Sequence, residues 1–300
     1  MSDANLQNLS RKRSTYLWLY LGGAVLLLVA IALWWAKVSV NPERVFWGTV
    51  DNSLATSGVT LSVNESSGQA SDRQDIQYSL GTTNQVHAIR TVKQGNTTVK
   101  TESVGNATKT FTRYTSITGQ SKKVNLNGII GVWSNPTTDT SSTQLLPQVA
   151  LGLALPLGAV PMPIGSIAND KRTDLIEQMR TRSLYQVDYQ RAEKQTKDGK
   201  LYYTYQVSMQ PVLYLSIMKS FAQSTGLKDF ENIDPNQYAG SSSIKLKLTI
   251  DAHARQLVKV VSEEQGYIET YSGYGVSTNV TLPKQAISLQ ELQKRLSELK

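Results

Sequence analysis

Cysteine is absent from the 300-residue chain, and histidine occurs only twice. Without cysteine the protein has no disulfide bond, no thiol nucleophile, no thiolate metal ligand and no site for a lipid on an N-terminal cysteine. Any folded domain must therefore be stabilised by its own hydrophobic core. His87 lies in an alternating segment and His253 in an expected turn, so we interpret both as ordinary sheet or surface residues.

Catalytic sequence motifs are also missing. The chain contains no HExxH pair, no phosphate-binding glycine loop and no Gly-x-Ser-x-Gly elbow. Asp229, Glu231 and Asp234 have a spacing that could serve a cation, but the segment lacks the glycine and the distal glutamate of a calcium loop, which favours a solvated linker. We therefore expect no enzymatic activity, no cofactor and no metal.

Acidic charge is scarcer than basic charge. The chain has 31 Lys and Arg against 23 Asp and Glu, for a formal net charge of +8. The basic residues do not cluster with aromatic ones, so no nucleic-acid partner is expected. This excess of basic residues favours weak attraction to anionic membranes or anionic wall polymers. Ordinary solubilising charge explains it equally well.

Residues 15–36 form the first of two long uncharged stretches. At about 1.5 Å per residue, a helix of this length spans the roughly 30 Å of a bilayer's hydrocarbon core. Aromatic rings near both ends are typical of the interfacial belts of membrane helices. The sequence therefore predicts a membrane anchor, whose marker residues are Trp18, Leu27, Trp34 and Trp35.

The flanking charges predict the orientation of this anchor. Arg11, Lys12 and Arg13 precede it, which places the N-terminus in the cytoplasm and the rest of the chain outside the cell membrane as a single-pass protein. A cleaved signal peptide is the alternative, because residues 30–32 read Ala-Ile-Ala, but the apolar run continues beyond them. The expected organisation is a cytoplasmic tail (1–14), an anchor (15–36), an extracytoplasmic domain (37–287) and a C-terminal helix (288–300).

The extracytoplasmic part has the pattern of a mixed domain. Helices are expected from residue 42, over 173–182 and over 211–225, with Asn41 as the N-cap of the first. Strands fill most of the rest, and the clearest alternates Ile244, Leu246, Leu248 and Ile250 with polar residues. The second strand of a hairpin through Asp198-Gly199 likewise carries Tyr203, Tyr205 and Val207 on one face. We predict an α+β fold in which a curved antiparallel sheet covers helices.

Three segments resemble a known family. The stretch "NPERVFWGTVDNSLATSGVTLSV" after the anchor, the late hairpin "KLKLTIDAHARQLVKVV" and the ending "YSGYGVSTNVTLP" are similar to the layout of lipoprotein-localisation-factor-like half-barrel domains, the LolA, LppX and LprG type. The similarity covers most of residues 41–283 in order. It implies a half-barrel that binds an apolar ligand. This chain departs from the family pattern by its predicted transmembrane anchor and its terminal helix.

The second uncharged stretch contains "LLPQVALGLALPLGAVPMPIG", residues 145–165, and it is interrupted by four prolines. Repeated proline excludes a second membrane helix. Two interpretations remain open: a short helix and a proline-rich strap that cover the open side of the half-barrel as a lid, or an ordinary core helix with its connecting loop. Both predict that the stretch is buried.

These observations lead to two functional hypotheses. The first is a membrane-anchored extracytoplasmic binding protein for a lipid, an acyl chain or an apolar peptide, and the alternative is a structural or assembly protein of the cell envelope with protein partners. Fold alone does not choose between them. The residues expected to line the ligand or to form the core are Leu151, Leu155, Tyr203, Tyr205, Val207, Ile217, Phe221, Leu246, Leu248 and Ile250.

Overall fold

The computed structural model describes residues 27–28, 40–81, 84–106, 109–119, 125–135, 161–225, 234–262, 264, 266–277 and 279–298. The predicted anchor lies outside these ranges, apart from Leu27 and Leu28, whose side chains are exposed. Within the described ranges, no helix has both the length and the hydrophobicity needed to cross a bilayer.

One open sheet of 13 strands dominates the described part of the chain. Its order is β13-β6-β5-β4-β3-β2-β1-β12-β11-β10-β9-β7, with β8 paired to β9 off this path. All the pairings are antiparallel except β13 with β6. The strands are β1 (Gly58–Ser67), β2 (Ala70–Ser79), β3 (Gln85–Gln94), β4 (Thr97–Asn106), β5 (Thr110–Thr118), β6 (Ser134–Asn135), β7 (Tyr185–Val187), β8 (Glu193–Lys197), β9 (Lys200–Met209), β10 (Ile244–Asp251), β11 (Gln256–Ser262), β12 (Tyr267–Ser272) and β13 (Ile287–Ser288).

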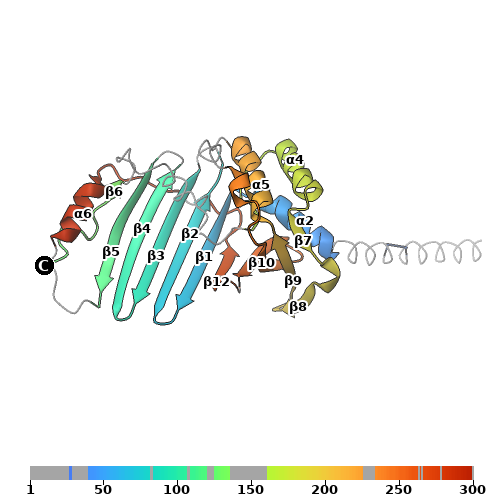
Figure 1. The fold of residues 1–300 in the computed structure, drawn as a ribbon, viewed down its shortest axis with the longest axis horizontal. Coiled ribbons are helices and arrows are strands. Elements are labelled where there is room, and N and C mark those ends of the chain that lie inside the picture. The colour runs from blue at the N-terminus through green and yellow to red at the C-terminus, as the bar shows by residue number, and fades with distance from the viewer. Residues whose placement is uncertain are drawn as a thin grey trace, which may run out of the picture.

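The helices occupy the two ends of this sheet. Helices α2, α4 and α5 gather at one end, whereas β2 to β5 extend beyond them and α6 lies near β6 at the far end (Figure 1). Helix α2 packs on β10 and β11, and α4 packs on α2 and α5. The helices are α2 (Pro42–Ala55), α4 (Asn169–Thr181), α5 (Pro211–Thr225) and α6 (Leu289–Ser297), with the 3-10 turns η2 (Tyr189–Arg191) and η4 (Pro235–Tyr238).

Local chemistry explains where α2 and α6 begin. The Asn41 side chain accepts hydrogen bonds from the backbone N–H groups of Glu43 and Arg44, and Pro42 has no N–H group that needs a partner. The Ser288 hydroxyl accepts the N–H of Glu291 at 3.1 Å. The predicted N-cap at Asn41 is confirmed.

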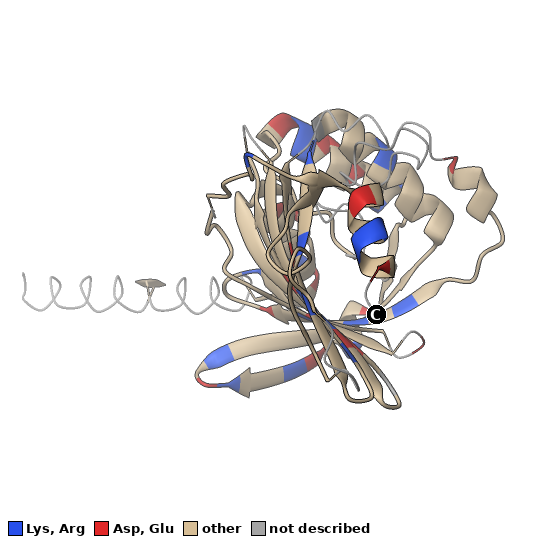
Figure 2. Cartoon of the chain, turned by 90° about the vertical axis from the view of Figure 1, so that its left-hand side faces the viewer, with Lys and Arg blue, Asp and Glu red and all other residues tan. Residues whose placement is uncertain are grey.

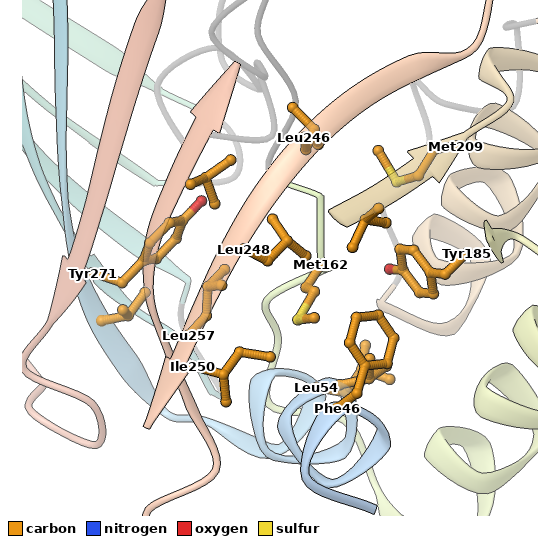
Figure 3. Close-up of a cluster of buried hydrophobic side chains, with 14 of the residues drawn as sticks. Phe46, Leu54, Met162, Tyr185, Met209, Leu246, Leu248, Ile250, Leu257 and Tyr271 are labelled. Atoms are coloured by element: carbon orange, nitrogen blue, oxygen red, sulfur yellow. The ribbon is translucent and has the colours of Figure 1, made fainter. Parts of the chain in front are cut away.

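The hydrophobic core lies between α2 and the strands that it covers. Strand β10 directs Leu246, Leu248 and Ile250 inward with at most 2% of each exposed, so the predicted register of this strand is confirmed. Figure 3 shows Leu248 and Ile250 on one side of Met162, with Phe46 and Leu54 of α2 opposite. The predicted α+β class with a large unclosed antiparallel sheet is therefore confirmed.

Local structure ends or interrupts two strands. The chain leaves the sheet between β7 and β8, because the Asp188 carboxylate caps η2 by accepting the N–H groups of Gln190 and Arg191. Strand β12 ends at Ser272, because Gly273 and Gly275 adopt positive φ and turn the chain.

Charged residues of both signs are interspersed over the described elements. Lysines and arginines lie beside acidic residues in the β8–β9 hairpin and in α6 (Figure 2). Such an arrangement is typical of a solvated surface.

Candidate functional site

The inner face of the sheet, defined as the face on which α2 packs, is mostly apolar. Direct strand pairing aligns Tyr205, Leu248, Val260, Glu269 and Val63 in one row across β9, β10, β11, β12 and β1. Paired residues point to the same side of a sheet, so this row shares the inner face. All its members are buried, and Glu269 is the one acid among them.

The apolar inner face continues past the helices. Leu61 of β1 pairs with Ile76 of β2, which in turn pairs with Ala88 of β3. Two residues further along these strands, Tyr78 of β2 pairs with Val86 of β3. These side chains are buried and belong to the same core cluster as Phe46 of α2. Figure 1 shows that α2, α4 and α5 lie at the other end of the sheet, beyond β12. The inner face of β1 to β3 is thus apolar, and its side chains are buried although α2, α4 and α5 gather toward the other end of the sheet.

Two of the predicted site residues hold the start of α2. The Tyr203 hydroxyl donates to the backbone carbonyl of Val40 at 3.0 Å, and the Tyr205 hydroxyl donates to that of Pro42 at 2.9 Å. The Tyr205 ring packs edge to face on Phe46, with 5.5 Å between ring centroids. These tyrosines join the sheet to the point where the chain enters the domain.

The other predicted site residues divide between the core and the undescribed part of the chain. Val207 of β9 lies in the same core as Leu246, Leu248 and Ile250. Ile217 and Phe221 are buried on α5. Leu151, Leu155, Trp18, Trp34 and Trp35 lie outside the described residues, and Leu27 is exposed.

The described end of the proline-rich stretch is tied to the helices. Residues 161–168 have no regular secondary structure, but the N–H of Gly165 bonds to the Ser53 carbonyl and that of Ile167 to the Leu54 carbonyl. The Tyr185 hydroxyl donates to the Pro161 carbonyl at 2.6 Å. Residues 145–160 lie outside the described part, so the choice between a lid and plain core stays a prediction.

Glu269 is the main polar feature of the inner face. Its side chain is 0% exposed, and its paired neighbours are Val63 and Val260. The Tyr271 hydroxyl donates to Glu269 Oε2 at 2.6 Å, whereas Oε1 has no hydrogen-bond partner among the described residues. Burial without a neighbouring cation raises the pKa of Glu269 from its ordinary 4.5 to about 8.

Three more phenols lie within range of this carboxyl group. Burial, and after it the negative charge of Glu269, raises the pKa of Tyr78 in β2, Tyr214 in α5 and Tyr267 in β12. The Tyr78 hydroxyl is buried and, like Glu269 Oε1, has no hydrogen-bond partner in the described part of the chain. We refer to Glu269, Tyr271 and Tyr78 as the carboxyl cluster.

The two histidines belong to separate polar arrangements. His87 Nε2 lies 2.9 Å from Glu102 Oε1, and Arg113 donates to the other oxygen of the same carboxylate at 2.6 Å. Burial acts against ionisation of Glu102, but these two partners lower its pKa overall. His253 lies in the turn between β10 and β11, where its backbone N–H donates to the Asp251 carboxylate. In the described ranges, no group of three or more His, Asp or Glu is arranged to hold a metal ion.

Comparisons with known proteins find similarity only at the level of structure. No protein-family model and no curated protein sequence matches the chain. LprF from Mycobacterium bovis is similar in structure, with a TM-score of 0.41 and 14% identity over 82% of this chain and 97% of that one. The Mycobacterium tuberculosis lipoprotein LppX is similar with a TM-score of 0.36 and 12% identity over 82% and 99%. LppX is one of the proteins named in the resemblance that the sequence suggests.

Sequence reasoning missed the carboxyl cluster. The segment "YIETY" alternates strictly, so Glu269 shares a face with Tyr267 and Tyr271 at period two. An acid between two aromatic residues on one face of a strand was a readable signal. The contribution of Tyr78 was not readable, because β2 reaches this place only through the pairing of β1 with β12.

Proposed function

We propose that the chain is a binding protein for a hydrophobic ligand, held on the inner face of β1 to β3. One observation carries the proposal: the apolar inner face continues beyond the helices that cover the other half of an unclosed sheet. Apolar surface of this kind is stabilised when a ligand or another apolar group keeps water from it. A lipid, an acyl chain or an apolar peptide fits these requirements.

We further propose that the domain works outside the cell, tethered to the membrane. The support is the uncharged stretch 15–36, the basic residues that precede it and the short distance to α2. The two tyrosine hydroxyls that hold Val40 and Pro42 keep the domain close to the end of the tether. A ligand on the inner face would then be handled near the bilayer surface.

The test is to fill the proposed surface. Ala88 lies on the inner face of β3 with 9% exposed, so Ala88→Trp should occupy ligand space. Ala70 lies exposed at the start of β2 and gives a matched control, Ala70→Trp. The full chain and both variants are purified in one non-ionic detergent and extracted with organic solvent, and bound lipid is quantified by mass spectrometry.

The wild type and Ala70→Trp should carry bound lipid or another apolar molecule in a fixed ratio to protein, and Ala88→Trp should carry markedly less. A wild type that carries no apolar molecule and takes up none when supplied would overturn the proposal. That result would instead favour the envelope-assembly hypothesis with protein partners.

A further inference from the structure

The outer face of β1 to β4, which is the face opposite α2, carries a hollow of about 580 Å³. Val63 points inward, so Asn64 next to it points outward, and so do the residues that pair with Asn64 across the strands. Two rows of outward residues line the hollow: Asn64, Arg73, Thr91 and Lys100, and next to them Ser66, Ser71, Lys93 and Thr98.

The sizes of these side chains explain the hollow. Thr91 and Thr98 are short and half-buried, so they form its floor. Arg73, Lys93 and Lys100 are long and exposed, so they form its rim. A floor of hydroxyl groups inside a rim of positive charge is thus a direct result of the strand register.

The three cations of the rim surround one residue of the floor. Arg73 of β2 and Lys100 of β4 both pair with Thr91 of β3, one strand spacing of about 4.8 Å on either side. Lys93 lies two residues further along β3, about 7 Å from Thr91. Three long, exposed cationic side chains that start this close together can reach one bound anion.

Asp75 is the acid that shares this face with the rim. It accepts a hydrogen bond from Arg73 Nε at 3.1 Å and another from the Ser62 hydroxyl. Burial acts to raise the pKa of Asp75, but Ser62, Arg73 and Lys100 lower it overall. Asp75 is therefore ionised and already paired, and its charge offsets one of the three cations.

Two further acids border the hollow but belong to the inner face. Asp72 accepts a hydrogen bond from Arg90 Nε at 3.0 Å. This hydrogen bond and, to a smaller extent, the charge of Glu65 raise the pKa of Arg90 against the effect of burial. Lys93 and Lys100 form no ion pair within the described ranges. The outer face therefore keeps an excess of positive charge at the hollow.

The lining selects a class of ligand. A tetrahedral phosphate directs its oxygens in several directions, which suits cations placed on three sides, and lysine and arginine are the usual partners of phosphate. Hydroxyl and amide groups donate to or accept from the hydroxyls of a polyol. The polar lining does not suit an apolar chain.

We propose that the hollow on the outer face of β1 to β4 binds a polyol phosphate such as glycerol phosphate. Arg73, Lys93 and Lys100 hold the phosphate group, and the hydroxyl groups of Thr91 and Thr98 bind the polyol. The hollow lies on the opposite face of the sheet from the proposed apolar site, so the two proposals stand or fall separately.

The experiment compares probes that carry one part of the ligand or both. The full chain in a non-ionic detergent is dialysed to equilibrium at low ionic strength against radiolabelled glycerol 3-phosphate, glycerol or inorganic phosphate. Glycerol 3-phosphate should bind about tenfold more tightly than glycerol, and added salt should weaken its binding. Equal affinity for glycerol, or for inorganic phosphate, overturns the inference, because the rim or the floor then contributes nothing.

A charge-matched control connects binding to the rim. The double variant Lys93→Gln/Lys100→Gln should weaken glycerol 3-phosphate binding by about tenfold. Lys194→Gln/Lys197→Gln removes the same charge from exposed positions of β8 and should leave the affinity unchanged. Neither double variant should change Tm, because the four side chains are exposed. Equal weakening by the two variants would show unspecific attraction and overturn the inference.

Competition identifies the source of the phosphate. Glycerophosphoglycerol has no acyl chains, whereas phosphatidylglycerol in mixed micelles presents the same head on a lipid. Displacement of labelled glycerol 3-phosphate by both assigns the hollow to the head itself, free or in a polymer. Displacement by phosphatidylglycerol alone assigns it to a lipid headgroup, and displacement by neither assigns it to a free monoester.

Discussion

At the scale of single residues, the placement of Glu269 makes stability depend on pH. The folded chain keeps this carboxyl protonated up to about pH 8, whereas the unfolded chain releases the proton near its ordinary pKa of 4.5. The folded state therefore binds more protons between these values. The contribution to stability is complete below pH 4.5 and is lost as pH rises to about 8.

We expect the free energy of unfolding to fall with rising pH over this window, by up to about 1.4 kcal/mol per pH unit from this group. Urea unfolding of the wild type and Glu269→Gln at several pH values measures the difference between them. Glutamine has nearly the same shape and does not titrate, so the variant should lack this slope. Parallel curves for the two proteins would contradict the assignment.

A second residue-scale prediction concerns β10. Leu248 is fully buried, so Leu248→Ala removes packed atoms and leaves a cavity, at a cost of about 2–5 kcal/mol. Lys245 lies on the same strand with its side chain 74% exposed, and Lys245→Ala should change stability by less than about 1 kcal/mol. Chemical denaturation measures both, and similar losses would refute the register.

Leu248 and Glu269 show that the sequence predicts which way a strand side chain points but not which residues it contacts. Period-two alternation places Leu248 inside without knowledge of any other strand, because side chains alternate across a sheet. The same rule points Glu269 inward but does not identify its neighbours. Tyr78 and Glu269 lie in strands distant in sequence, so the influence of Glu269 on the pKa of Tyr78 depends on tertiary pairing.

At the scale of elements, the starts of two helices were predictable from the side chain that caps each of them. Asn41 and Ser288 start their helices through their own hydrogen bonds, and both can be read from the sequence. The short 3-10 turn at Asp188 was missed because its flanking residues also suit a strand. The path of residues 161–168 could not be predicted either. This segment has no regular strand or helix pairing, and its position is fixed by hydrogen bonds to α2.

Amide hydrogen exchange tests the proline-rich stretch as an element. The amides of Gly165 and Ile167 should be protected in every state, because they bond to α2 carbonyls. If residues 145–160 act as a lid, their amides should exchange faster than those of β10 and slow down when decanol is added. Exchange as slow as that of β10, with and without the alcohol, would identify the stretch as ordinary core.

At the scale of the whole molecule, composition and alternation predicted the α+β class, but not the strand order. Strand order depends on pairs distant in sequence, such as Thr60 with Ser272, which no local pattern encodes. The parallel pairing of Ile287 with Ser134 is equally non-local. The open edges of the sheet and the separation of α2, α4 and α5 from β2 to β5 follow from those pairings.

The predicted anchor has its own whole-molecule test. N-terminal sequencing of protein extracted from membranes should recover residues before Thr15, because the apolar run continues past the Ala-Ile-Ala triplet. Carbonate washing should leave that protein in the membrane pellet, as expected for a spanning helix. A mature chain that begins near Leu33 would show a cleaved signal peptide instead.

The pairing of β1 with β12 has a consequence for how the chain folds. Strands β1 to β5 can form a meander by themselves, but the free side of β1 stays unpaired until β12 is available near the end of the chain. An unpaired strand edge is a template for aggregation, and pairings this distant in sequence form slowly. A chain that stops before β12 would therefore leave the edge of β1 unpaired in the middle of the sheet. We expect such a truncated chain to sediment as aggregate and not to remain in solution as a folded, shorter protein.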